Sequence, residues 1–310
     1  MSYSAQIDSG WLRRFFLRLR FWQPLHPFSG RFGSKDDYLA WFEKVPTPTL
    51  RKTAGHWQAC VAAPTMTGPQ SFRFFGVERT LSDNRGWHWK PWGENWLYNL
   101  HAFDDLVADQ AEARTDWHLG LITNWTVANP PGKGVGWESD CLSRRIVNWI
   151  RWDLSHQKLN EVAKRSLVVQ TLYLRQHLIP KLSSTYPTAS GKALLFAGAF
   201  FEGTEADHWR KTGLELVRDA VQSAAHRRRD AHYVHDLAVV EDLLDLVQLS
   251  KIYPGLLPLT DVAKFQAFAV ERLSRIENIG DRSAPVTGEH PVFFASPAVA
   301  SLRGYAGSLA

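Results

Sequence analysis

The sequence Leu142-Ser-Arg-Arg-Ile-Val-Asn-Trp-Ile-Arg-Trp-Asp-Leu154 is the clearest fold signal in the chain. Its apolar residues recur at the three- and four-residue spacing of one helical face, at Ile146, Val147, Trp149, Ile150 and Leu154. Arginine and asparagine occupy positions between them. The stretch therefore predicts an amphipathic helix that packs on a core.

The same kind of pattern recurs on both sides of this stretch. Residues 95–108 carry an apolar stripe, and Asn160 is placed to cap a helix that ends before Pro180. The remaining predicted helices begin at Ser190, at Thr204 with Asp207 as its capping-box partner, at Asp236 and at Thr260. Strand patterns are nearly absent between residues 95 and 276. The sequence therefore predicts an all-α fold of stacked helical hairpins over residues 91–280.

Less regular sequence lies on both sides of this helical region and within it. Residues 1–90 are broken by prolines and hold two short helical candidates, at 11–22 and 35–44, and one short strand at Ser71–Val77. Residues 124–140 are rich in glycine and proline and predict a long loop. Residues 281–310 predict a loosely ordered tail, with no second domain after it.

The composition limits the possible partners. Hydrophobic residues make up 45% of the chain and charged residues 22%, which is typical of a folded protein. The net charge of +5 favours an acidic partner, such as a polyanionic glycan or a nucleic acid. No nucleic-acid motif accompanies the charge, so we expect no nucleic-acid partner, but the charge by itself does not establish a polyanionic glycan as the partner. The 14 tryptophans allow two interpretations, because indoles stack on sugar rings and also fill the core between helices.

Other classes of protein are not expected from this sequence. No apolar run is long enough to predict a transmembrane segment. Cys60 and Cys141 show no metal-ligand spacing, so we expect neither a metal nor a cofactor; a single disulfide stays open. The stretch Trp11–Trp22 interleaves arginine with apolar residues and lacks the continuous apolar segment of a signal peptide.

Four segments of the helical region carry a more specific pattern. They are Trp96-Leu-Tyr-Asn-Leu-His-Ala-Phe-Asp-Asp-Leu106, Asn129–Glu138 with Leu142–Trp152, Gly191-Lys-Ala-Leu-Leu-Phe-Ala-Gly-Ala-Phe-Phe201, and Val239-Val-Glu-Asp-Leu-Leu-Asp-Leu246. In this order they resemble the N-terminal domain of heparinase II/III-family polysaccharide lyases. The resemblance spans roughly residues 70–300, and its most specific element is Arg145-Ile-Val-Asn-Trp149.

The resemblance implies both a fold and a reaction. The family fold is an incomplete α/α toroid followed by a β-sandwich, and we expect this chain to end before such a sandwich. The implied reaction is β-elimination on polysaccharides that contain uronic acid. A site for this reaction must neutralise the sugar carboxylate, remove the C5 proton and protonate the leaving oxygen.

The resemblance also assigns candidate residues. The family's Asn-His pair, whose asparagine serves the carboxylate, falls on Thr185 and Tyr186. The family's acid/base loop falls on a segment with His232, Tyr233 and His235. The candidate substrate-binding residues are Asn99, His101, Trp137, Arg144, Arg145, Asn148 and His232. Packing inside the fold is the alternative for His101, and joining of helices is the alternative for the two arginines. Glu241 and Asp242 are predicted near the start of a helix, where its dipole favours acidic residues.

Three interpretations of function stay open at this point. The chain is a polysaccharide lyase, a non-catalytic protein that binds acidic glycans, or a shortened or frame-shifted reading frame without independent function. Members of the family commonly work in the periplasm or outside the cell, so the resemblance implies export. The identity of the polysaccharide and the oligomeric state do not follow from the sequence.

Overall fold

The computed structural model describes residues 35–57, 63–156, 158–178, 188–226, 233–279 and 299–309. These residues are mostly helical, which confirms the predicted all-α class. The helices are α2 (Lys35–Phe42), α3 (Glu94–Ala102), α4 (Thr115–Ala128), α5 (Ser139–His156), α6 (Glu161–Gln176), α7 (Ala189–Phe200), α8 (Thr204–His226), α9 (Tyr233–Ile252), α10 (Leu259–Ile279) and α11 (Val299–Ser308). Within this described part, no helix is long and apolar enough to cross a membrane.

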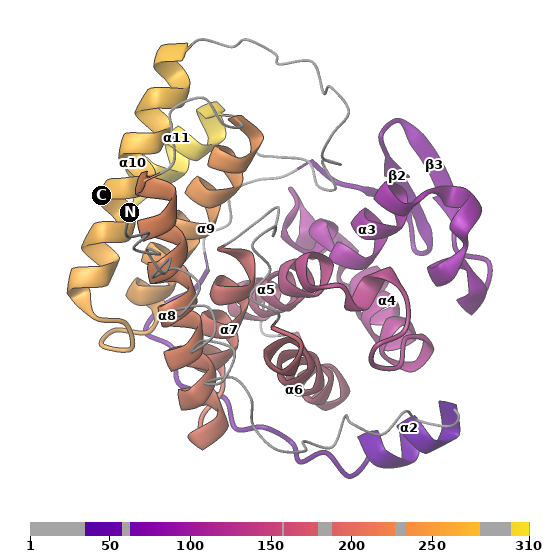
Figure 1. Ribbon diagram of the computed structural model, residues 1–310. Helices are drawn as coiled ribbons and strands as arrows, with labels where there is room; N and C mark the ends of the chain where they lie inside the picture. Colours follow the sequence, from indigo (N-terminus) through magenta and orange to yellow (C-terminus); the bar gives the residue numbers. More distant parts are fainter. Residues whose placement is uncertain are drawn as a thin grey trace, which may run out of the picture.

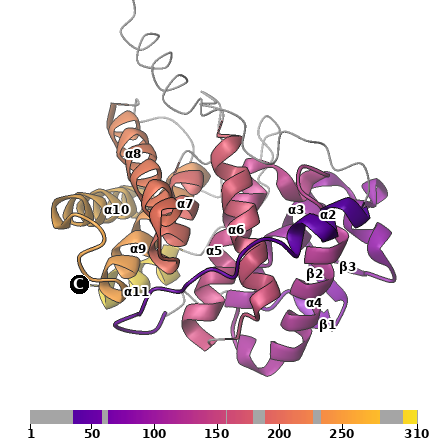
Figure 2. The ribbon, with the colours of Figure 1, turned by 90° about the horizontal axis from the view of Figure 1, so that it is seen from below.

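The helices are arranged around α5 and α7 (Figures 1 and 2). The helices α3, α4 and α6 lie on one side of this centre, and α8, α9, α10 and α11 lie on the other. Buried apolar side chains from Tyr38 to Leu309 belong to one continuous core cluster. The described residues between Tyr38 and Leu81, the helical region and α11 therefore share one core cluster.

An extended segment before the helical region joins three of its helices. The backbone N–H groups of Arg51, Ala54 and Trp57 donate to carbonyl groups at Phe200, Ile252 and Leu154, which lie at or near the ends of α7, α9 and α5. The Arg51 guanidinium donates to two further carbonyl groups at the end of α7, those of Ala199 and Phe201. This segment satisfies carbonyl groups that would otherwise lack a partner at helix C-termini.

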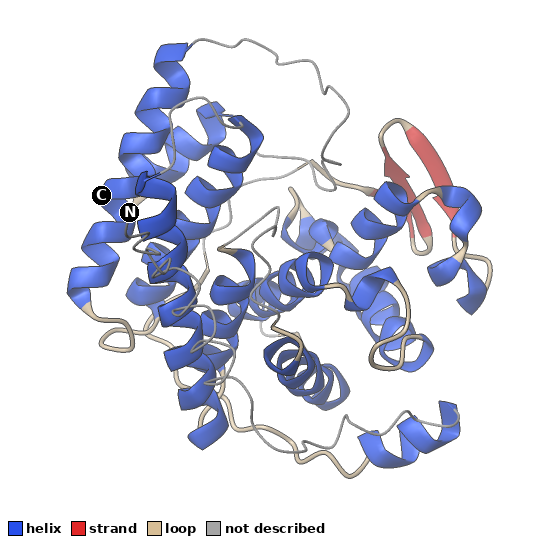
Figure 3. Cartoon of the chain, viewed as in Figure 1, coloured by secondary structure: helices blue, strands red, loops and turns tan. Residues whose placement is uncertain are grey.

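The short predicted strand belongs to a three-stranded antiparallel sheet (Figure 3). Its strands are β1 (Met66–Gly68), β2 (Ser71–Phe74) and β3 (Val77–Thr80). The predicted strand at Ser71–Val77 was too long, because Phe75 and Gly76 form the turn between β2 and β3 with φ values of 54° and 75°. Positive φ at both positions is the signature of a type I′ hairpin.

Several helix ends differ from their predicted positions. The helix predicted over 95–108 ends at Ala102, because Phe103 adopts a left-handed conformation with φ 61° and a 3-10 turn, Asp104–Val107, follows. The loop predicted over 124–140 begins only after Ala128, since the apolar face of α4 extends to the buried Trp125. Asn160 caps α6 as predicted, accepting from the Ala163 N–H at 2.9 Å.

Two further predictions, one about the start of α7 and one about the C-terminal tail, differ from the structure. Thr188, and not Ser190, occupies the N-cap position of α7, and the Ser190 hydroxyl instead lies 3.2 Å from that of Ser143 on α5. The tail was predicted to be loosely ordered, yet α11 forms within it and buries Leu302 and Tyr305 against the core. An amphipathic pattern of alanine, glycine and two large side chains is too weak to stand out without its packing partners.

Candidate functional site

A small pocket lies where α5, α7 and α9 meet, and its lining is dominated by charged side chains. Arg144, Asn148 and Arg151 come from α5, Lys192 from α7, and Glu241 and Asp242 from α9. Its volume is about 40 Å³. This is room for a few water molecules or one small polar group such as a carboxylate, and it is too small for a sugar ring.

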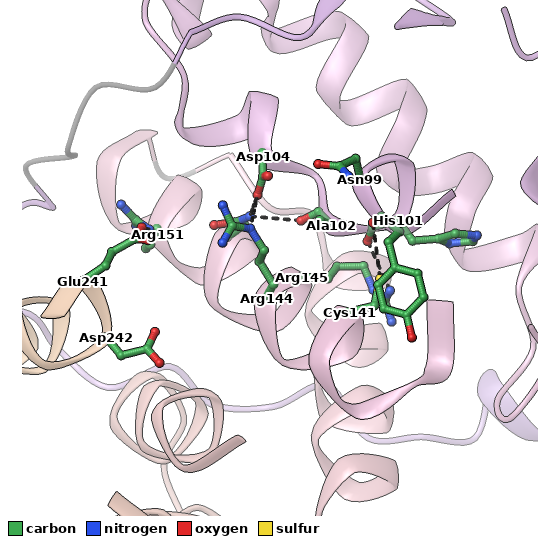
Figure 4. A network of polar contacts seen from close by, with 12 residues as sticks. Asn99, His101, Ala102, Asp104, Cys141, Arg144, Arg145, Arg151, Glu241 and Asp242 are labelled. Carbon is green, nitrogen blue, oxygen red and sulfur yellow. Dashed lines mark hydrogen bonds and ion pairs between the residues drawn. The ribbon is translucent and has the colours of Figure 1, made fainter. Parts of the chain in front are cut away.

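On one side of the pocket, hydrogen bonds connect α5 to the 3-10 turn that follows α3 (Figure 4). The left-handed Phe103 reverses the chain, and the Asp104 carboxylate accepts from Arg144 Nε at 2.6 Å and from Asn148 Nδ2 at 2.8 Å. The Asn148 amide also donates to the Ala102 carbonyl at 3.0 Å. Asp104 thus orients both polar side chains, although it was not among the site residues predicted from the sequence.

The opposite wall is a buried ion network between α5, α7 and α9. Lys192 Nζ lies 2.7 Å from carboxylate oxygens of both Asp242 and Asp245. Arg151 Nη1 lies 3.7 Å from Glu241 and 3.5 Å from Asp245. Burial alone would lower the pKa of the Lys192 ammonium, but the two aspartates raise it above its usual value, so the lysine is charged.

Glu241 and Asp242 therefore act differently from the prediction. Because α9 begins at Tyr233, they lie in its interior and not in its first turns. The Asp242 carboxylate accepts from the Thr188 hydroxyl as well as from Lys192, so it binds groups of α7 and its N-cap. The helix dipole does not explain these two residues.

Around the pocket, three cations face five carboxylates. Arg144 is paired with Asp104, while Arg151 and Lys192 are paired with Glu241, Asp242 and Asp245. Asp140 adds a further carboxylate at the rim. An entering anion would therefore meet the Arg144 guanidinium in surroundings with more carboxylates than cations.

The predicted binding residues divide into two groups. Arg144 and Asn148 line the pocket, whereas Asn99, His101, Trp137 and Arg145 are buried and do not line it. The Trp137 indole N–H donates to the Asn129 carbonyl at 3.2 Å, and Asn99 Nδ2 donates to the Asn95 carbonyl at 2.8 Å. The Asn99 bond thus stays within α3 and the Trp137 bond closes the 129–138 loop, while His101 and Arg145 join different helices.

His101 and Arg145 form the centre of this buried group. His101 Nδ1 accepts from the Trp125 indole at 2.9 Å and its Nε2 faces the Trp87 carbonyl at 2.9 Å, which assigns the proton of the neutral ring to Nε2. Burial, with the nearby positive charge of Arg145, lowers the pKa of His101 to about 3. The packing alternative for His101 is the one that this geometry supports.

Arg145 is held without a carboxylate within ion-pair distance in the described part of the chain. Its guanidinium donates to Gln170 Oε1 at 2.8 Å and to the His101 carbonyl at 3.2 Å. It also lies over the Trp125 ring at 3.9 Å. Burial lowers its pKa to about 10, so it stays charged at neutral pH. Arg145 on α5 thus contacts α3, α4 and α6. This geometry supports the joining of helices, the alternative to substrate binding, for Arg145.

The candidate acid/base residues lie at or beyond the limits of the described structure. Thr185, Tyr186 and His232 fall outside the described residues. Tyr233 and His235 belong to the first turn of α9. Position 235 is three residues before Ala238, which lines the pocket.

The described residues offer no cluster of histidine, cysteine or acidic side chains that could hold a metal ion. Cys141 is a buried free thiol that contacts the Tyr98 carbonyl, and burial raises its pKa to about 12.

Comparison of the chain with protein-family models, with curated proteins and with solved structures finds no match in any of the three.

Proposed function

We propose that this chain is a heparinase II/III-like protein that binds acidic polysaccharide at the α5–α7–α9 pocket and cleaves it by β-elimination. In this proposal the helices α3–α10 form the incomplete α/α toroid of the family.

The observation that carries the proposal is the convergence of four separate sequence segments on one pocket. Asp104 comes from the first segment with family resemblance, Arg144 and Asn148 from the second, Lys192 from the third and Asp242 from the fourth. These segments are distant in sequence, and each resembles a different part of the family's N-terminal domain. Their meeting at one polar pocket supports the interpretation that the motifs mark a site.

The size and donors of the pocket suit the carboxylate of a uronic acid. About 40 Å³ accepts the carboxylate group while the sugar ring stays outside. Arg144 supplies the guanidinium that would hydrogen-bond the carboxylate. Both amide hydrogens of Asn148 already donate, to the Ala102 carbonyl and to Asp104, so Asn148 helps to position this wall of the pocket. Hydrogen bonds to the carboxylate reduce its charge and make the C5 proton easier to remove, as β-elimination requires.

The base would come from the start of α9. Positions 235, 238, 242 and 245 share one face of a helix, and residues 238 and 242 of this set line the pocket. His235 is therefore the first candidate for proton transfer, with Tyr233 as the second.

The reaction has a direct test. The purified chain is incubated with alginate, heparan-type and bacterial exopolysaccharides, and the ultraviolet absorbance of the new C4–C5 double bond is followed. We expect activity that His235→Gln lowers at least 100-fold, since general acid–base catalysis contributes about 10²–10⁴-fold. His208→Gln, an exposed histidine on α8, is the matched control and should keep full activity. Absence of absorbance on every substrate at high protein concentration would exclude the lyase reaction.

A second candidate, glycan binding without cleavage, is favoured by one specific observation. The cations of the pocket are already paired with carboxylates of the chain, so little positive charge is left to stabilise a transition state. This candidate predicts binding with no new absorbance, and the binding should weaken with salt because the chain as a whole carries a net charge of +5. Arg144→Gln should weaken binding more than Arg275→Gln, which removes an exposed arginine of α10. Failure to bind any acidic polysaccharide at low salt would exclude both candidates.

A further inference from the structure

A strained and exposed aromatic residue lies at the tip of the β2–β3 hairpin. Phe75 has φ 54° at the first position of a turn that normally takes asparagine or glycine there. Its side chain is also 61% exposed. Left-handed backbone costs a non-glycine residue about 1–2 kcal/mol, and the exposed ring recovers little of this by burial. A bulky residue that is both strained and exposed points to a contact outside the chain.

Phe75 lies on the rim of an open groove between the hairpin and the start of α3. The groove has a volume of about 420 Å³, and its other aromatic residues are Phe74, Trp92 and Trp96. Trp96 makes edge-on contacts with Phe74 at 4.9 Å and with Trp92 at 4.7 Å, and its indole donates to the Val77 carbonyl. The groove is therefore rigid, aromatic and within the size range of ligand sites, about 300–1,000 Å³.

The groove is lined by one cation, Arg79, and by one carboxylate, Glu94, and the two form no ion pair. The Arg79 guanidinium lies 5.7 Å from the Trp92 ring and 5.8 Å from the Trp96 ring. In the described part of the chain no carboxylate pairs with it, and its Nε–H is buried without a hydrogen-bond partner. In this respect Arg79 differs from Arg144, Arg151 and Lys192, which are all paired.

We propose that this groove is a second glycan site, which binds a pyranose residue carrying an acidic group. The sugar ring stacks on Phe75 and Trp92, and Arg79 is the counter-charge for the acidic group. Aromatic faces bind the C–H face of sugars, and an unpaired guanidinium selects acidic over neutral rings. The choice of an acidic glycan rests on the proposed function, whereas the stacking site rests on the groove alone.

Another cavity of similar size serves as an internal comparison. It lies between the end of the hairpin and α4, has a volume of about 420 Å³, and its lining includes Asp83, Asp116 and Trp117 but no lysine or arginine. Its lining has two carboxylates and no cation, whereas the aromatic groove has one carboxylate, Glu94, and the cation Arg79. The aromatic groove is therefore the better place for an acidic sugar.

The test uses the full chain and three variants. Binding of polygalacturonate oligosaccharides and of neutral cello-oligosaccharides of equal length is measured by isothermal titration calorimetry at low salt. Phe75→Gly keeps the turn, since glycine adopts positive φ freely, and should leave thermal stability equal or higher. Arg79→Gln removes the charge. Trp89→Ala removes an aromatic residue that is 51% exposed but lies outside the groove, and is the matched control.

We expect Phe75→Gly and Arg79→Gln each to raise the Kd for the acidic oligosaccharide about 3- to 10-fold, given the usual worth of one aromatic or cation contact. Trp89→Ala should bind as the unmodified chain does, and the neutral oligosaccharide should bind more weakly throughout. If the chain binds the acidic oligosaccharide and both groove variants bind it equally well, the second site is wrong and the proposed function stands. If the unmodified chain binds no acidic glycan, the proposed function fails and the groove assignment fails with it.

Discussion

At the scale of single residues, His101 was predicted as a candidate substrate-binding residue and is a core residue in the structure. All residues of α3 from Trp96 to Ala102 are buried, so the helix has no solvent-facing side in this stretch. Gly136 lies so close that a Cβ atom there would be 2.4 Å from His101 Nδ1. Helical periodicity identifies a buried face only when another face is exposed, and for this reason the sequence left both interpretations of His101 open.

The buried histidine predicts sensitivity to mild acid. Its pKa is about 3 in the folded chain and about 6.5 in an unfolded one. Between these values the unfolded state binds one proton more, so the free energy of unfolding falls as the pH falls below about 6.5. Burial also lowers the pKa of His88 and of His156, which add to the effect in the same direction.

Urea titrations between pH 7.5 and pH 4.5 measure this directly. We expect a loss of about 1.4 kcal/mol per pH unit for each histidine that stays neutral in the folded chain. In His101→Gln the slope should be smaller by one such contribution. A free energy of unfolding that is constant between pH 7 and pH 5 would contradict the prediction.

At the scale of secondary-structure elements, α7 owes its central place to its small residues. A Cβ atom at Gly198 would lie 2.6 Å from the Ala206 carbonyl oxygen, and one at Gly213 of α8 would lie 2.6 Å from the Gly191 carbonyl oxygen. Glycines on both helices thus allow their backbones to approach closely. Intrinsic helix propensity disfavours glycine here, and the close packing of α7 against α8 compensates for it.

This close approach predicts opposite effects for two glycine-to-alanine substitutions. Gly198→Ala should destabilise the chain by about 1–3 kcal/mol, because the atoms in its way belong to the α8 backbone and cannot move independently. Gly120→Ala on α4 meets no atom within 4 Å and should stabilise it by up to about 1 kcal/mol. Urea denaturation of both variants checks the pair, and equal effects would show that α7 and α8 are farther apart.

At the scale of the whole molecule, the C-terminal helix completes the ion network beneath the pocket. The Tyr305 hydroxyl lies 3.0 Å from the Asp245 carboxylate and 2.6 Å from Gln248 Oε1, and Lys251 Nζ donates to the Leu309 carbonyl. Burial would raise the pKa of Asp245, but Arg151, Lys192 and the tyrosine hydrogen bond keep it below its usual value. Asp245, which pairs with Arg151 and Lys192 of the pocket wall, thus depends on Tyr305 of α11, 60 positions further along the chain.

The contribution of this helix is measured by comparing two buried tyrosines. Tyr305→Phe removes a hydrogen bond to a buried carboxylate and should cost about 1.5–3 kcal/mol. Tyr253→Phe removes a buried hydroxyl that has no hydrogen-bond partner among the described residues, and should be neutral or stabilising. Urea denaturation at neutral pH gives both values. If the two variants lose the same stability, Tyr305 contributes packing alone.

The sequence was sufficient for the helical class, the cap at Asn160 and the polar pair Arg144 and Asn148, because spacing along a helix depends on local geometry that adjacent residues specify. It did not reveal Asp104, the network around Asp245 or the folding of α11, because each depends on charges and apolar surfaces brought together from distant segments. The same holds for Glu241 and Asp242, whose partners on α5 and α7 lie far away in sequence. Local patterns specify which residues share a face of an element. Tertiary packing determines which faces meet, because ion pairs and burial arise only where two elements exclude water together.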